Sequence, residues 1–123
     1  MSDSSINFGQ LTNITPDTRR YRAGEAIFEK GDVGFELLVI KQGDVELRIG
    51  ERVLKTLGTG DIFGEMALVD DSTRSASAIA LSEVEIVPIS EKQFVNLIRE
   101  TPSFALDVMR VLAQRLRAET RKA

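Results

Sequence analysis

The stretch Phe63-Gly-Glu-Met-Ala-Leu-Val-Asp-Asp-Ser-Thr-Arg-Ser-Ala-Ser77 decides how this 123-residue chain is read. The glycine at 64 predicts a turn, and the four residues after it predict a short helix through Leu68. A polar turn follows, and Arg74 stands just beyond it. The stretch therefore predicts a short helix and a loop set between β-strands.

Short strands separated by glycine turns flank this stretch, from about residue 20 to residue 89. The run 35–41 is mostly apolar, and in 45–50 the apolar side chains of Val45, Leu47 and Ile49 alternate with Glu46, Arg48 and Gly50. Because the turn 42–44 separates the two runs, they predict a β-hairpin. Further strands are expected at 53–57, 76–81 and 84–89. This pattern favours an antiparallel β-roll, sandwich or barrel.

The last third of the chain changes from a two-residue to a 3.6-residue period. Ser90 and Gln93 have the spacing of a capping box, which opens a helix over about 91–99. Thr101 before Pro102 predicts the N-cap and first residue of a second helix, over about 102–121. One stripe of this helix should carry its apolar side chains, namely Ala105, Val108, Met109, Leu112 and Leu116. The fold class is thus α+β and mainly β.

Size and composition bound the organisation and the function. We expect one domain over 20–123, preceded by a partly ordered segment over 1–19. With no histidine and no cysteine, the chain lacks the commonest general base and Cys/His zinc sites, and we expect no enzyme. A net charge of −3 argues against a nucleic-acid partner. No secretory leader or membrane-length apolar run is present in the sequence, so we expect a cytoplasmic protein with no membrane partner.

Two nearby patterns suggest other ligands. The adjacent carboxylates Asp70 and Asp71 could attract a hard cation, but their spacing does not fit an EF-hand and the composition is that of a turn. We therefore expect no metal. The run 58–64 resembles a dinucleotide fingerprint but has one residue too many before its third glycine, and no long helix follows. Gly58 and Gly60 are therefore predicted to be turn glycines.

Three polar side chains point to the ligand chemistry. The planar fork of Arg74 can bond a phosphate bidentately, with the Ser75 hydroxyl beside it and the free N–H groups of the short helix nearby. An ionised Glu65 only accepts hydrogen bonds, so it would repel a phosphate unless it bonded a hydroxyl of the same ligand. One arginine and one carboxylate together predict a ligand that contains a phosphate and a sugar.

Phe-Gly-Glu-Met-Ala-Leu followed by Arg-Ser-Ala-Ser closely resembles the phosphate-binding cassette of cyclic nucleotide-binding domains. That family includes regulatory subunits of cyclic AMP-dependent kinase, the catabolite activator protein and cyclic nucleotide-gated channels. The resemblance also takes in Arg22-Ala-Gly-Glu25 and Gln42-Gly-Asp44, and it extends over about residues 20–120. It implies an antiparallel β-roll or jelly-roll with a short phosphate-binding helix and two C-terminal helices.

The resemblance also implies roles for individual residues. Glu65 would bond the ribose 2′-OH, Arg74 would pair with the cyclic phosphate, and Ser75 would support that phosphate. Backbone along the short helix, at Gly64, Met66 and Ala67, would complete these contacts. Leu47 would pack on the purine, although an inward strand residue is equally well explained as core. Arg115 would contact the base from the last helix, with a solvated arginine or a salt-bridge partner as the other interpretation.

The leading hypothesis is a non-catalytic sensor for cyclic AMP, with cyclic GMP left open, in which binding repositions the C-terminal helices and signals to an unknown effector protein. One position departs from the family: Phe35, followed by Glu36, stands where many members carry an acid that helps to position the cassette arginine. The departure favours a second hypothesis, an interaction or scaffold protein with an unused pocket. The long helix could also form a homodimer, as the corresponding helix does in the catabolite activator family.

Overall fold

Strand β3 (Glu36–Gln42) lies at the centre of the fold and is buried on both faces. Leu37 and Val39 pack with the C-terminal helices, whereas Leu38 and Ile40 pack with a second sheet. Successive side chains of a strand point to opposite faces, so an unbroken apolar run needs cover on both sides. The run 35–41 therefore fixes three layers, with the helices on one side of the first sheet and the second sheet on the other.

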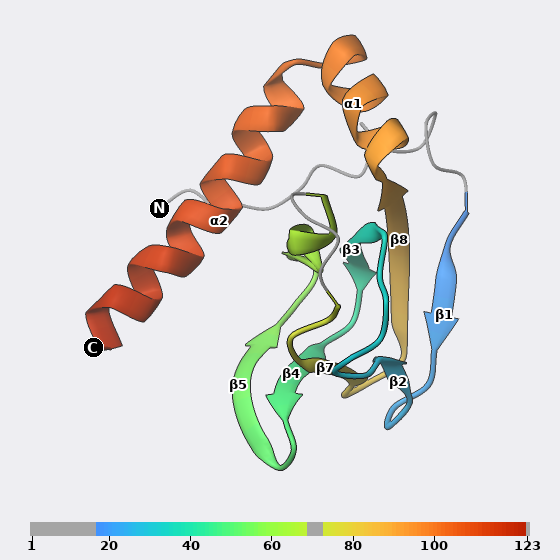
Figure 1. Cartoon of the computed structure of the whole chain (residues 1–123), viewed down its shortest axis with the longest axis vertical. Helices are drawn as coiled ribbons and strands as arrows, with labels where there is room; N and C mark the ends of the chain where they lie inside the picture. Colours follow the sequence, from blue (N-terminus) through green and yellow to red (C-terminus); the bar gives the residue numbers. More distant parts are fainter. Residues whose placement is uncertain (1–16, 69–72, 123) are drawn as a thin grey trace.

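The computed structural model describes residues 17–68 and 73–122, so most of the predicted N-terminal segment lies outside it (Figure 1). Two four-stranded antiparallel sheets have the strand orders β1-β8-β3-β6 and β2-β7-β4-β5. The remaining strands are β1 (Arg19–Tyr21), β2 (Ala26–Phe28), β4 (Val45–Ile49), β5 (Arg52–Leu57), β6 (Ile62–Phe63), β7 (Ser77–Ala80) and β8 (Val84–Ser90). Between β6 and β7 lies η2 (Glu65–Leu68), one turn of 3₁₀ helix. The predicted mainly β roll with a short helix is confirmed.

The predicted hairpin between 35–41 and 45–49 is wrong. Strand β3 pairs with β6 and β8, whereas β4 pairs with β5 and β7, so the chain crosses from one sheet to the other at the turn between them. Gly43 makes the crossing with a φ of 104°, and a Cβ there would lie 2.4 Å from the carbonyl oxygen of Glu83. The apolar run and the alternating pattern identified the two strands, but neither carries information about which strands pair.

The two C-terminal helices begin close to the predicted positions. The Ser90 hydroxyl accepts from the Gln93 N–H at 3.2 Å, and the Gln93 side chain accepts from the Ser90 N–H at 2.9 Å, so the capping box is confirmed. Helix α1 (Glu91–Glu100) follows, and α2 (Ser103–Lys122) begins one residue later than expected. Thr101 joins them: its N–H bonds to the Leu97 carbonyl, and its own carbonyl accepts from Phe104.

The apolar stripe predicted for α2 divides between two faces. Phe104, Val108 and Val111 are buried against the first sheet, whereas Met109 and Leu116 are more than 60% exposed. An apolar residue at the edge of the stripe of an amphipathic helix can face either the core or solvent, and the docking angle of the helix decides which.

Within the described residues, no helix is both long and apolar enough to cross a membrane.

Candidate functional site

The candidate site is a cavity of about 400 Å³ enclosed by η2, the segment 73–76, the β4–β5 hairpin and α2. Its volume lies in the usual range for small-molecule sites. Seven residues predicted from the sequence line it: Leu47, Gly64, Glu65, Met66, Arg74, Ser75 and Arg115. The eighth, Ala67, belongs to η2, but its side chain lies outside the described part of the structure, as do residues 69–72 with Asp70 and Asp71. The fold thus brings together residues that are up to 68 positions apart.

Arg74 is held in the cavity wall by backbone oxygens and an aromatic ring. Its Nη1 donates to the Gly64 carbonyl at 3.2 Å, and its Nη2 donates to the Glu36 carbonyl at 3.0 Å. Its Cζ lies 4.5 Å from the centroid of the Phe28 ring, which is a cation–π geometry. Within the described residues, the two carbonyl bonds account for two of the five N–H donors of the guanidinium. The other donors can bind an anion.

Two glycines leave the room that this guanidinium occupies. A Cβ on Gly34 would lie 2.1 Å from Arg74 Nε, and a Cβ on Gly64 would lie 2.6 Å from Arg74 Nη1. Real Cβ atoms do not approach other atoms so closely. Gly64 also has a φ of 75°, a conformation that residues with a side chain rarely adopt. Both positions therefore require glycine as long as Arg74 keeps its place.

Among the described residues, three carboxylates act on the charge of Arg74 without a direct ion pair to it. Burial lowers the pKa of its guanidinium, while the charges of Glu36, Glu65 and Asp32 act in the opposite direction. An arginine in a protein remains protonated under such a shift, so the site keeps its positive charge. The Glu36 carboxylate bonds Arg19, at 2.9 Å, so Glu36 supports Arg74 through its carbonyl oxygen and not through an ion pair.

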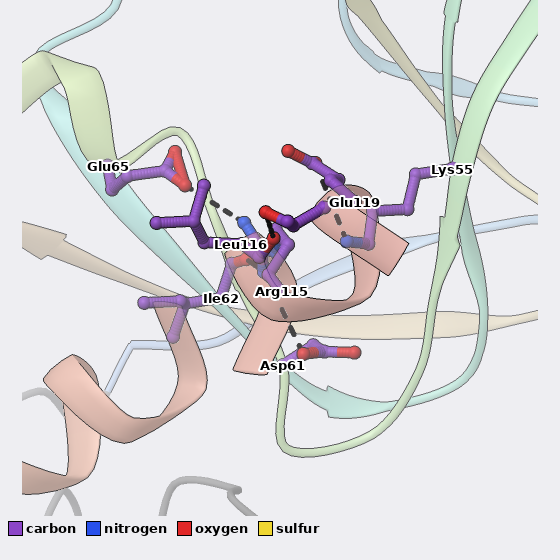
Figure 2. Close-up of polar contacts among 8 residues, drawn as sticks. Lys55, Asp61, Ile62, Glu65, Arg115, Leu116 and Glu119 are labelled. Carbon is purple, nitrogen blue, oxygen red and sulfur yellow. Dashed lines mark hydrogen bonds and ion pairs between the residues drawn. The ribbon is translucent and has the colours of Figure 1, made fainter. Parts of the chain in front are cut away.

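Arg115 from α2 is a second arginine in the cavity wall, and only 13% of its side chain is exposed. Its Nη1 donates to Glu65 Oε1 at 2.9 Å (Figure 2). Its Nη2 donates to the Ile62 carbonyl and lies 3.7 Å from Asp61 Oδ1. Helix α2 is therefore tied to η2 and to β6 at the edge of the cavity. The salt-bridge interpretation of Arg115 is the one that this geometry matches, and a contact with a base stays a prediction.

Leu47 is half-buried, packs against the core between the sheets and also lines the cavity, so its two predicted roles are compatible. Ser75 and Met66 are exposed at the cavity lining. Among the described residues, no group of three acidic side chains is arranged to hold a metal ion.

Sequence reasoning missed several residues of the site. Phe28 and Gly34 contact Arg74 from segments about 40 residues earlier in the chain, and no local pattern marks either of them. Lys55 and Glu119 approach each other to 3.8 Å across the cavity mouth. Glu119 stands four residues after Arg115, so its place on the same face of the helix was the one signal that could have been used.

The sequence and the fold are similar to those of one protein family. A family model described as "Cyclic nucleotide-binding domain" matches residues 18–101. A cyclic AMP receptor protein of Thermus thermophilus is 40% identical over 104 residues, which cover 80% of this chain and 48% of that protein. A cGMP-dependent protein kinase of Eimeria tenella is 39% identical over 83 residues, which cover 67% of this chain and 8% of the kinase. This chain therefore spans half or less of these two relatives.

The crystal structure of the Thermus thermophilus catabolite activator protein is similar to this chain, with a TM-score of 0.76 and 33% identity. The match covers 93% of this chain and 57% of that one.

The Arg115–Glu65 contact gives a prediction about stability. Replacing Arg115 with alanine leaves the Ile62 carbonyl and the Glu65 carboxylate without their partner, which should lower the free energy of unfolding by about 1–3 kcal/mol. Replacing the exposed Arg117 with alanine should change it by less than about 0.5 kcal/mol. Urea denaturation measures both free energies of unfolding.

A double-mutant cycle tests the contact itself. Glu65→Gln should change the free energy of unfolding much less once Arg115 has been replaced with alanine. Additive losses would show that the two side chains do not interact.

Proposed function

This chain belongs to the cyclic nucleotide-binding domain family, and on that premise we propose that it is a non-catalytic sensor whose ligand occupies the cavity beside α2. The proposal rests on one observation: Arg74 and Glu65 line the same cavity, and this cavity is large enough for a small ligand. Arg74 is a cation with N–H donors that its two carbonyl bonds do not use, and the Glu65 carboxylate accepts hydrogen bonds. A ligand that contains both a phosphate and a hydroxyl satisfies both groups.

The groups lining the cavity suggest an orientation for this ligand. The phosphate would bond the free edge of the Arg74 guanidinium, with the exposed Ser75 hydroxyl beside it. The ribose hydroxyl would bond Glu65, whose Oε1 already accepts from Arg115 and whose charge is thereby partly neutralised. The apolar side chains of Leu47 and Leu54 provide a surface for the base. We keep cyclic AMP as the first candidate and cyclic GMP as the second, because one relative is a cyclic AMP receptor and the other a cGMP-dependent kinase.

Ligand binding would act on α2 through Glu65. The carboxylate that is proposed to bond the ribose also bonds Arg115 of that helix, so a ligand changes the energy of the contact that ties the helix to the roll. A ligand shifts a conformational equilibrium only when its affinity differs between the two states. The Glu65–Arg115 contact supplies such a difference. A downstream effector protein that reads the position of α2 is the partner that the proposal requires.

Isothermal titration calorimetry of the full chain with cyclic AMP and cyclic GMP tests the proposal. At least one of them should bind, and Arg74→Ala should weaken its binding by about 2–5 kcal/mol, because it removes the charged partner of the phosphate. Arg20→Ala is the matched control. The Arg20 side chain is 80% exposed on β1 and does not line the cavity, so its loss should leave the affinity unchanged.

Absence of heat, and of any thermal shift, with both nucleotides at millimolar concentration would overturn the sensor proposal. The scaffold hypothesis with an unused pocket would then take its place. Unchanged affinity in Arg74→Ala would instead overturn the assignment of the phosphate to Arg74.

We extend the proposal to self-association through α2. The exposed residues Leu106, Met109, Ala113 and Leu116 follow one another at alternating spacings of three and four residues. This is the a/d pattern of a helix that packs against a second helix. Exposed apolar side chains in such a row indicate a partner, and a second copy of the chain supplies the same row.

Light scattering after size-exclusion chromatography tests this assembly. The chain should elute with twice its mass of 13.6 kDa, and the double variant Met109→Glu/Leu116→Glu should elute as a monomer, because it places charges in the apolar row. Leu81→Glu, at an exposed turn position outside α2, should leave the dimer intact. A monomeric native chain at high concentration would contradict the proposal.

Two expectations from composition concern the whole protein and remain predictions. The exclusion of nucleic acid rests on the net charge of this chain alone, and the chain covers only 48% of the Thermus thermophilus receptor protein. We therefore restrict that exclusion to the 123 residues of this chain. A cytoplasmic location likewise stays a prediction from the sequence.

A further inference from the structure

We propose that Phe28 is the positioning residue of Arg74, and that its aromatic face holds the guanidinium in the orientation that binds the phosphate. The inference rests on the proposed function, in which Arg74 is the phosphate ligand. The bonds from Nη1 and Nη2 to the carbonyls of Gly64 and Glu36 hold one edge of the Arg74 guanidinium, and a third contact is needed to fix its tilt about that edge. The Phe28 ring, 4.5 Å from Arg74 Cζ, is placed to do so.

The strand pairing of the roll brings the two side chains together. Phe28 ends β2, and its Cα partner in β7 is Ala78, four residues after Arg74. The register of this pairing shifts between Ala26 and Phe28, an irregularity of the kind that redirects a side chain. The backbone of Arg74 is fixed independently, because its N–H bonds the Asp32 carbonyl at 2.7 Å and its carbonyl accepts from the Gly31 N–H at 2.8 Å.

The ring itself is anchored in the core. The centroid of Phe28 lies 5.7 Å from that of Phe63, with the ring planes tilted by 40°. Phe63 is 1% exposed and belongs to the core between the two sheets. A ring held in this way can give a fixed orientation to a side chain that packs on it. The contacts from Phe63 to Phe28 and from Phe28 to Arg74 therefore connect the core to the wall of the cavity.

A cation–π contact is compatible with phosphate binding because the two use different parts of the guanidinium. Arg74 Cζ lies over the face of the Phe28 ring, whereas Nη1 and Nη2 bond the carbonyls of Gly64 and Glu36, and the remaining N–H groups would bond phosphate oxygens. Loss of the ring would leave the carbonyl bonds in place but free the guanidinium to tilt. The affinity for the phosphate should then fall without loss of the charge.

Gly34 offers an independent way to disturb the same contact. A Cβ at this position would lie 2.1 Å from Arg74 Nε and 2.2 Å from Arg74 Cζ. Gly34 does not have the positive φ that would bar alanine from its backbone, and the three described atoms nearest to a Cβ there all belong to the guanidinium. Gly34→Ala therefore displaces Arg74 and leaves the Phe28 ring chemically unchanged.

The test is a set of calorimetric titrations with whichever of cyclic AMP and cyclic GMP the native chain binds more tightly. Phe28→Leu keeps an apolar side chain of similar size but removes the aromatic face, and should weaken binding about 5- to 30-fold. Phe28→Tyr keeps the face and should bind within about threefold of the native chain. In the Arg74→Ala background, Phe28→Leu should cause no further loss, because the ring acts through the arginine. Urea denaturation of each variant reports whether it is folded.

Three results would overturn the inference. Equal affinity in Phe28→Leu and the native chain shows that the ring does not position Arg74, and losses that add in the double variant show that it acts in another way. Both leave the proposed function standing. A native chain that binds neither nucleotide overturns the inference together with the proposed function. If Phe28→Leu does not fold, Phe28→Met takes its place with the same expected loss and the same double variant, and Gly34→Ala, which displaces Arg74 directly, shows how large a loss the displacement of Arg74 causes.

Discussion

The half-buried guanidinium of Arg74 constrains how the segments of this roll are placed. A charged group that is partly buried needs favourable partners. The carbonyl oxygens of Gly64 and Glu36 accept hydrogen bonds from Arg74, and the Phe28 ring makes a cation–π contact with it. Each partner comes from a different segment, so the guanidinium keeps its place only when η2, β3 and β2 are all correctly positioned. The glycine at 34 follows from the same constraint, because a side chain there would occupy the space of the guanidinium. The site and the fold therefore depend on one another.

A second pair of charges connects the cavity to the C-terminal helix. Arg115 reaches from α2 to Glu65 and to the Ile62 carbonyl, so the helix contacts the group proposed to bond the sugar. The other end of the cavity is fixed by Arg74, whose backbone is bonded to the turn at residues 31 and 32. One end of the site is thus joined to the rigid sheets and the other to a helix that packs on them. In the sensor that we propose, this division would let the phosphate anchor the ligand while the sugar acts on the helix.

The sequence predicted what local chemistry determines. The Ser90–Gln93 capping box and the place of Arg74 and Glu65 at one ligand follow from residue types and spacing, whereas Arg115 was placed at that ligand by the family resemblance. Features set by tertiary packing were not predicted. The pairing partners of β3 depend on the crossing at Gly43, and the exposure of Met109 and Leu116 depends on the docking angle of α2. Phe28 was not predicted as a residue of the site, because its contact with Arg74 forms only when β2 pairs with β7.

Among the described residues, two carbonyl oxygens and an aromatic ring contact the Arg74 guanidinium, and Phe35, the predicted departure from the family pattern, is exposed. The central claim is that Arg74, held in this way, binds the phosphate of a cyclic nucleotide. A crystal structure of the chain with the bound nucleotide tests it most directly. We expect phosphate oxygens at about 3 Å from the Arg74 guanidinium, which remains stacked on Phe28. A bound nucleotide whose phosphate lies away from Arg74 would contradict the claim.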